Sequence, residues 1–406
     1  IMDLIHSHGV SNEVEGLSRF DGTDCQYFHE GPRGRQSAWD SRCNDYAKPQ
    51  ELHFLLTNCR FWLDAYHLDG FRFDGITSML YLHHGLCHAL TSYDDYFVDV
   101  MDDDALTYLP LANTLIPELT PEAMTIAEDV SGIPGLAVPE EEGGVGFDFR
   151  FAMGVPDYWI RLTKDTRDED WPMAHLWYEL TNRRSDEKTV SYAESHDQAL
   201  VGDQTLIFRL MGDAIYHHMN VSDNHLIIDR GVALHKMIRL LTLATAGHGY
   251  LNFMGNEFGH PEWIDFPRRE NNWSYLYARR QWHLMDDPGL KYSQLACFDR
   301  DMIQLAKTHA LFQGPLRLIH THDEDKIIAF ERNRLFFAFN FHPEVSFTDY
   351  FFYLPPGRYE WVLDSDNRSY GGHGRLDDAR TGLYESIPRK DHSEGGLDLY
   401  LPCRTV

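Results

Sequence analysis

Three carboxylates stand at the ends of short apolar segments that lie far apart in the sequence. Asp74 ends the run F-R-F-D, Glu128 follows the apolar residues 123–127, and Asp197 ends the run 189–197. Two carboxylates on one sugar can perform retaining glycoside chemistry, one as nucleophile and one as general acid and then base. If all three met, their mutual repulsion would favour protonation of one of them, which a general acid requires.

An arginine stands two residues before the first of these carboxylates. Alternation along an extended segment places Arg72 and Asp74 on one face, and Phe71 and Phe73 on the other. The fixed positive charge of Arg72 therefore lies beside Asp74 and favours its ionised, nucleophilic form. An isolated R-x-D is more often a structural ion pair, so the companion motifs must decide between the two interpretations.

Further polar side chains follow other apolar segments. Asp3 and His8 end the first eight residues, His196 precedes Asp197, and Glu257 closes residues 250–257. Histidines can donate hydrogen bonds to sugar hydroxyls, although both histidines could instead be scaffold residues. Glu257 is equally compatible with substrate contact and with capping of a loop.

The elements that must position these groups alternate between helix and strand. Apolar residues recur with the helical period from residue 49 to 66, directly before the strand at 70–74. Further strands are expected at 123–130, 147–153, 189–197 and 250–257, with a helix at 232–246. This alternation predicts a parallel sheet of α/β class, and polar groups at successive strand ends are typical of a TIM-type (β/α)8 barrel. About six β/α units are visible, so the first two are expected upstream of Ile1; a doubly wound sheet is the structural alternative, but no Gly-rich phosphate loop follows any strand.

The pattern changes near residue 315. Segments 326–331, 335–341, 346–354 and 359–363 are short, rich in aromatic and β-branched residues, and separated by Asn, Pro and Gly. They predict a C-terminal antiparallel β-sandwich. We therefore expect a catalytic barrel at 1–314, lacking its first two strands, and an all-β domain at 315–406.

Charge and composition argue against several classes of binding partner. The formal net charge of -27 argues against nucleic acid and anionic membranes, and no run of 18 apolar residues is present. The six scattered cysteines suit free thiols in a reducing compartment, so we expect a cytoplasmic protein, or a plastid protein in a plant or alga. His83, His84 and His88 lack an acidic partner at a suitable offset, so no metal or cofactor is expected. We expect a monomer.

The chain resembles the α-amylase family, and within it the glucan-branching subgroup. Four motifs in order carry the family resemblance: D-L-I-H-S-H (3–8), D-G-F-R-F-D-G-I (69–76), A-E-D-V-S (127–131) and A-E-S-H-D-Q (193–198). The subgroup resemblance includes G-P-R-G (31–34), E-E-G-G-V-G-F-D-F-R (141–150) and F-M-G-N-E-F-G-H-P-E-W-I-D-F-P-R (253–268). The resemblance extends over essentially the whole chain. The sequence departs from the pattern of the family at residues 36–39 and at Arg209.

The resemblance implies a role for each candidate. Asp74 is the expected nucleophile, Glu128 the general acid/base and Asp197 the stabiliser of the transition state. The donor sugar is expected to be lined by Asp3, His8, Arg72 and His196. Retaining chemistry predicts a separation of roughly 5–5.5 Å between the carboxyl groups of Asp74 and Glu128.

The implied activity is a glycosyl transfer. An α-1,4 glucan chain (glycogen, amylose or amylopectin) would be cleaved and the fragment passed to a 6-hydroxyl, which makes an α-1,6 branch. One alternative is a hydrolase of the same fold, an amylase or debranching enzyme; another is a non-catalytic glucan-binding protein. Four tryptophans could stack on glucose, but packing is the preferred interpretation for each of them: Trp39, Trp177, Trp263 and Trp273.

Overall fold

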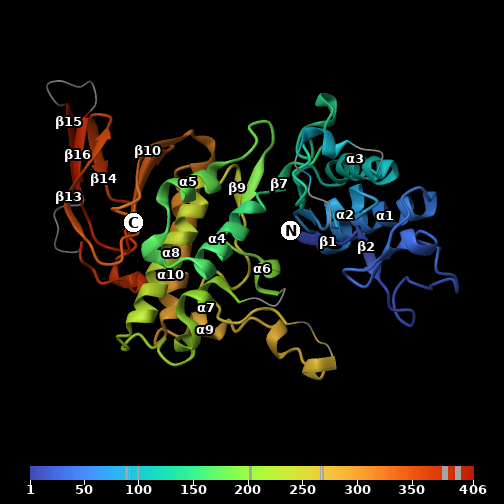
Figure 1. Ribbon diagram of the computed structural model, residues 1–406, viewed down its shortest axis with the longest axis horizontal. Coiled ribbons are helices and arrows are strands. Elements are labelled where there is room, and N and C mark those ends of the chain that lie inside the picture. Colours follow the sequence, from blue (N-terminus) through green and yellow to red (C-terminus); the bar gives the residue numbers. More distant parts are fainter. Residues whose placement is uncertain are drawn as a thin grey trace. The chain divides into compact units, whose positions relative to one another are not determined.

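The computed structural model describes residues 1–86, 90, 92–97, 100–200, 204–265, 267, 269–376, 383–388 and 395–406. The chain divides into two compact units (Figure 1). The first contains Ile1–Met153 with Arg183–Val190, and the second contains Gly154–Asn182 with Ser191–Val406. Each unit is described by itself below.

A parallel sheet forms the centre of the first unit. Its hydrogen-bonded order is β1 (Met2–Leu4), β5 (Gly70–Phe73), β6 (Met124–Ala127), β7 (Phe149–Phe151) and β8 (Thr189–Ser191). The register pairs Asp3 with Arg72, and Phe73 with Ala127. Consequently the residues that follow β1, β5 and β6 emerge at the same edge of the sheet. The parallel sheet confirms the fold class that the sequence predicts.

Helix α1 (Pro49–Tyr66) precedes β5, as the helical period predicts. Proline at its first position suits a helix start, and Leu55, Cys59 and Leu63 form its buried stripe. Helix α2 (Ile76–Leu80) follows β5, and α3 (Asp103–Leu119) is capped by Asp102, whose side chain accepts hydrogen bonds from the backbone N–H groups of Asp104 and Ala105. A small antiparallel sheet joins β2 (His8–Val10), β4 (Ser41–Cys43) and β3 (Arg35–Gln36).

Helices dominate the N-terminal part of the second unit. They are α4 (Gly154–Asp165), α5 (Met173–Thr181), α6 (His196–Leu200), α7 (Leu206–Met211), α8 (Leu226–Thr245), α9 (His283–Asp286) and α10 (Lys291–Thr308). Helix α8 is buried along most of its length. Strand β9 (Gly249–Tyr250) follows it, and the backbone N–H of Leu251 donates to the carbonyl of Ser191 at 3.0 Å.

The C-terminal part of the second unit is all-β, as the sequence predicts. One antiparallel sheet contains β10 (Leu316–His322), β11 (Ile327–Arg332) and β12 (Leu335–Asn340). The other has the order β13 (Phe347–Leu354), β16 (Gly395–Leu401), β15 (Leu383–Pro388) and β14 (Gly357–Glu360). An apolar core includes residues of both sheets, among them Ile327 and Phe352. The boundary between residues 314 and 315 stays a prediction.

Four expected strands are shorter than predicted, since β6 covers four residues of 123–130 and β7 three of 147–153, and the other two differ most. The segment 189–197 is extended only at Thr189–Ser191, and His196 and Asp197 begin helix α6 instead of ending a strand. The reason is local capping, because Ser195 donates from its backbone N–H and its hydroxyl to the side chain of Gln198, and the N–H of Asp197 donates to the Ser195 hydroxyl. Similarly, the segment 250–257 is extended only at Gly249–Tyr250, and Glu257 lies in turns.

Candidate active site

One buried guanidinium is surrounded by three of the predicted carboxylates in the first unit. Arg72 is on β5, and its side chain is only 6% exposed. It forms an ion pair with Asp74, as the R-x-D spacing predicts, and further pairs at 3.5 Å with Asp3 and 3.9 Å with Glu128. The positive charge offsets the repulsion among these acidic groups, and it fixes their side chains around one point.

Backbone hydrogen bonds connect Glu128 to the residues around Asp74. The N–H of Glu128 donates to Phe73 O at 3.0 Å, and the N–H of Ile76 donates to Glu128 O at 3.1 Å. The carboxylate of Glu128 accepts the N–H of Gly75 at 2.6 Å. Glu128 is therefore tied, through backbone and side chain, to the residues on both sides of Asp74. Glycine serves here because its φ is +66° and an added Cβ would lie 2.9 Å from the Ser7 hydroxyl.

A buried network holds the loop that follows Glu128. Arg150, on β7, pairs with Asp129 at 2.8 Å and with Glu187 at 2.7 Å, and the side chains of both acids are fully buried. Thr77, on α2, donates to Asp129 at 2.6 Å, and its hydroxyl accepts the N–H of Val130 at 3.0 Å. The Thr77–Asp129 contact joins the loop after Glu128 to the helix after Asp74. It therefore helps to set the spacing of the two carboxylates.

His8 and Trp39 lie beside this group. The ring centroids of His8 and Trp39 are 4.9 Å apart, and His8 Nδ1 is 2.8 Å from the Ser7 hydroxyl. Burial lowers the pKa of His8, and the negative charge of Asp74 opposes that shift in part. A neutral His8 offers one ring N–H donor and one acceptor to a hydroxyl-rich ligand. Trp39 is 48% exposed, so the preference for packing is wrong at this position.

The remaining predicted residues form a second group, in the second unit. His196 Nε2 is 3.1 Å from Asp197 Oδ1, and the ring of His196 lies 6.0 Å from the ring of Phe253. Arg280 lies over Phe253 at 5.4 Å from the ring centroid, and burial lowers the pKa of Arg280 although the charges of Glu194 and Glu257 oppose that shift. The carboxylate of Glu257 accepts the N–H of Gly255 at 2.6 Å, which is a turn-capping contact.

Glu194 is a buried acid of this second group that the sequence did not single out. Its carboxylate accepts the N–H of Leu206 at 2.7 Å, and Asn256 donates to its backbone carbonyl at 3.4 Å. Burial raises the pKa of Glu194 to about 7, against the lowering effects of the Leu206 N–H and of nearby arginines. His196 and Asp197 lie between Glu194 and Leu206 in the sequence. The hydrogen bond from Leu206 to Glu194 therefore joins the two ends of the segment that carries them. The adjacency of Glu194 to S-H-D was the available signal.

Glu194 should make stability depend on pH. Its pKa in the folded protein, about 7, lies above the ordinary value of 4.5, so its contribution to stability is lost as pH rises through this window. The free energy of unfolding of the wild type, minus that of Glu194→Gln, should therefore fall by up to about 3 kcal/mol between pH 4.5 and 8. Urea unfolding at several pH values measures it. The exposed Glu118→Gln is the control, and a pH-independent difference for Glu194→Gln would contradict the assignment.

The other candidate tryptophans and His6 differ in their burial and in their packing partners. Trp177 packs on Phe330 with ring centroids 5.2 Å apart, as predicted, whereas Trp273 is 65% exposed, so the preference for packing is wrong there too. Trp263 is partly buried and stacks on Tyr277 at 6.4 Å. His6, which the motif left without a role, is buried between Tyr108 and Asn58, at 2.5 and 3.0 Å.

Neither a metal centre nor a membrane span appears in the described part of the chain. No group of three or more His, Cys, Asp or Glu residues there could hold a metal ion. His88, one of the three histidines considered for such a site, lies outside the described residues. No helix among the described residues has the length and apolarity that a bilayer crossing requires.

Comparison with known proteins first defines the class. Residues 318–406 match the family described as "Alpha amylase, C-terminal all-beta domain". The solved α-amylase from Anoxybacillus aligns with 100% of this chain and 74% of its own, with a TM-score of 0.57 and 13% identity. The solved α-amylase from H. orenii aligns with 90% of this chain and 65% of its own, with a TM-score of 0.53 and 14% identity. The fold is that of the α-amylases.

Sequence comparison then defines the subgroup. The chain is 53% identical over 408 residues to a Felis catus protein named 1,4-alpha-glucan-branching enzyme, and 50% identical over 407 residues to a Dictyostelium discoideum protein of that name. Both alignments cover 100% of this chain, which spans 58% and 60% of the respective relatives. A Solanum tuberosum protein of that name is 50% identical over 92% of this chain, which covers 44% of it. The chain is thus homologous along its whole length to eukaryotic proteins named 1,4-alpha-glucan-branching enzyme, which confirms the resemblance its motifs carry.

Proposed function

We propose that this chain carries the catalytic residues of a 1,4-α-glucan branching enzyme. It would cleave an α-1,4 bond of a glucan, hold the fragment covalently, and transfer it to a 6-hydroxyl to form an α-1,6 branch. The arrangement of Asp74 and Glu128 around Arg72 is the observation that supports this proposal most strongly. Relatives named 1,4-alpha-glucan-branching enzyme, about 50% identical along this chain, support the choice of reaction.

In the proposed mechanism, Asp74 attacks the anomeric carbon while Glu128 protonates the leaving oxygen. An ester forms between Asp74 and the glucan fragment, and the shortened chain departs. Glu128, now ionised, then removes the proton of an acceptor 6-hydroxyl, whose oxygen displaces Asp74. Two displacements restore the α-configuration. Transfer prevails over hydrolysis where the acceptor glucan excludes water from the ester.

The other predicted residues are proposed to bind the donor sugar. Asp3 and Arg72 would orient the Asp74 carboxylate and contact hydroxyls, while neutral His8 would donate a hydrogen bond. We propose that His196 and Asp197 act on the same sugar ring, with Asp197 as the stabiliser of the transition state. Glu257 remains compatible with substrate contact and with its observed turn-capping contact.

The reaction type has a direct test. Linear amylose is incubated with the protein, and iodine colour and reducing ends are followed together. Branching lowers the iodine colour while the number of reducing ends stays constant, because each cleavage is matched by a transfer. A rise in reducing ends that parallels the loss of colour would instead establish a hydrolase. Binding without either change would establish a non-catalytic glucan-binding protein.

Comparing Gly75→Ala with a control glycine should distinguish the effect of a displaced Glu128 contact from the effect of backbone strain. The new Cβ would crowd the Ser7 hydroxyl and displace the N–H that Glu128 accepts, so we expect kcat to fall about 10- to 100-fold. Gly143→Ala is the matched control, because Gly143 has a φ of +87° but nothing within 4 Å of an added Cβ. Equal kcat values for the two variants, measured by branching assay, would argue against a role for the Gly75 contact.

The setting of the enzyme is also proposed. The substrate would be an α-glucan polymer such as glycogen, amylose or amylopectin. We place the reaction in the cytoplasm, or in the plastid of a plant or alga, and expect the protein to act as a monomer. Sedimentation velocity measures the last point.

A further inference from the structure

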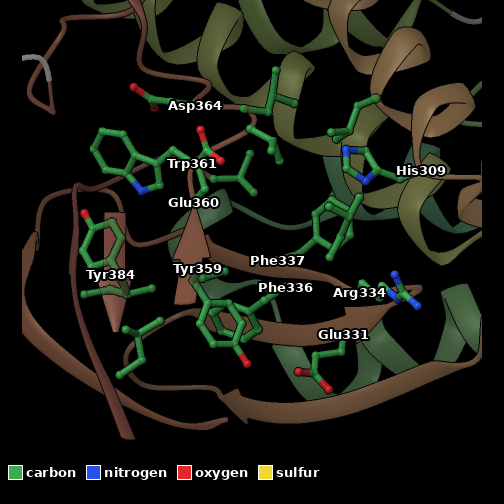
Figure 2. A pocket seen from close by; sticks show the side chains of 18 of the residues that line it. His309, Glu331, Arg334, Phe336, Phe337, Tyr359, Glu360, Trp361, Asp364 and Tyr384 are labelled. Carbon is green, nitrogen blue, oxygen red and sulfur yellow. The ribbon is translucent and has the colours of Figure 1, made fainter. Parts of the chain in front are cut away.

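The second unit contains a cavity of about 840 Å³, lined mostly by its all-β part and also by Leu240, Leu305 and His309 of its helical part (Figure 2). Its size is within the range of small-molecule sites. Buried apolar side chains, among them Phe337, Leu397 and Leu401, form part of its wall. None of the proposed catalytic or sugar-binding residues described above lines it.

Three aromatic side chains of this cavity lie on or directly beside one antiparallel strand pair, β14 and β15. Tyr359, on β14, is directly opposite Tyr384, on β15. Trp361 lies just beyond the end of β14, and its ring centroid is 5.8 Å from that of Tyr384. All three side chains are partly exposed. Tyr359 and Tyr384 also pack against the apolar core of the domain, so each of these rings offers only part of its area to a ligand, as in sites that stack flat apolar faces.

The cavity lining has equal numbers of positively charged guanidinium groups and negatively charged carboxylates. The described lining includes three guanidinium and three carboxylate side chains: Arg317, Arg334, Arg358, Glu331, Glu360 and Asp364. Arg317 and Glu331 form an ion pair with Nε and Oε2 3.1 Å apart. In the view of Figure 2, Trp361 and Tyr384 lie on one side of the cavity, and His309 and Arg334 on the other. Such a lining disfavours a strongly charged ligand and offers donors and acceptors to a neutral one.

We propose that this cavity is a second carbohydrate-binding site, which takes a short stretch of an α-glucan chain. Glucose rings have apolar faces, which would stack on Tyr359, Trp361 and Tyr384, and hydroxyl edges, which would meet the charged side chains. The choice of α-glucan among neutral sugars rests on the proposed function. A second contact with the same polymer raises the affinity for long chains over short ones without a change in the chemical step.

Calorimetric titration with maltoheptaose tests the site apart from catalysis. The wild-type chain should bind at two sites, and Trp361→Ala should lose one of them or weaken it by roughly 10-fold. Trp361→Phe should restore most of the binding because it keeps a stacking ring. Tyr353→Ala is the matched control, since Tyr353 is 48% exposed on β13 of the same domain and does not line the cavity. Thermal unfolding checks that each variant is folded.

The kinetic expectation is a rise in KM for long amylose of roughly fivefold in Trp361→Ala, with kcat and the KM for short donors unchanged. Unchanged maltoheptaose binding in folded Trp361→Ala and Tyr384→Ala would overturn the proposal. A lower kcat on short donors would overturn it as well, since it would place Trp361 in the chemical step. Failure of the proposed function is distinguishable: maltoheptaose would still bind at Trp361 while the iodine assay detected no branching.

Discussion

Asp74→Asn is expected to reduce branching activity by a factor of about 10⁴ or more, because an amide cannot form the glycosyl ester. The change is nearly isosteric, so the Arg72 side chain keeps a hydrogen-bond acceptor and the site keeps its shape. Glucan binding should therefore stay within about twofold of the wild type. The measurement combines the iodine assay with calorimetric titration of maltoheptaose.

Asp64→Asn is the matched control for this experiment. Asp64 also pairs with an arginine, Arg60 at 3.0 Å, but on the exposed surface of α1. Its loss should leave activity unchanged, since exposed pairs contribute little. Undiminished turnover by Asp74→Asn would refute the nucleophile assignment. A comparable loss in both variants would indicate a general effect on folding.

Arg150→Met is expected to lower the free energy of unfolding by about 3–5 kcal/mol. Methionine preserves much of the volume but removes the charge that two fully buried carboxylates share, Asp129 and Glu187. Asp129 would then lose its ion pair, and Glu187 would keep only the weaker pair with Arg184 at 3.7 Å, so buried negative charge would be poorly compensated. Urea unfolding measures the loss. Branching activity should also fall, because the loop after Glu128 depends on this network.

Two controls make the Arg150 prediction specific. Arg161→Met removes an arginine that is 62% exposed and 3.9 Å from Glu179, and it should cost at most about 1 kcal/mol. The triple change Arg150→Met, Asp129→Asn and Glu187→Gln removes the buried charges together, so it should be less destabilising than Arg150→Met alone. A triple variant that is less stable than the single one would show that packing, and not uncompensated charge, dominates.

Much of the first unit follows from local sequence patterns. The helical period and a proline predict α1, and the bounds of the helix agree with that prediction. Alternation in F-R-F-D predicts the pairing of Arg72 with Asp74, because two residues on one strand face must be neighbours. The contacts of Arg72 with Asp3 and Glu128 depend on the order of strands in the sheet, which local pattern does not specify.

Other features depend on long-range packing and were missed. Trp39 is exposed beside His8, although large aromatic side chains are more often buried. Glu194 owes its raised pKa to burial, which depends on the tertiary fold. The run 189–197 reads as one strand, but capping by Ser195 ends the extended conformation early. Strands β10, β15 and β16 were not expected; Gly395 and Gly396 open β16, and glycine is uncommon in strands.

The central claim is that Asp74 becomes covalently bonded to the transferred glucan. Glu128→Gln should trap this state when α-maltosyl fluoride is the donor, because fluoride leaves without a general acid while the second displacement lacks its base. Mass spectrometry of proteolytic fragments should then find one maltosyl group on the fragment that contains Asp74. A maltosyl group on Asp3 or Asp197, or none on any fragment while fluoride is still released, would contradict the account.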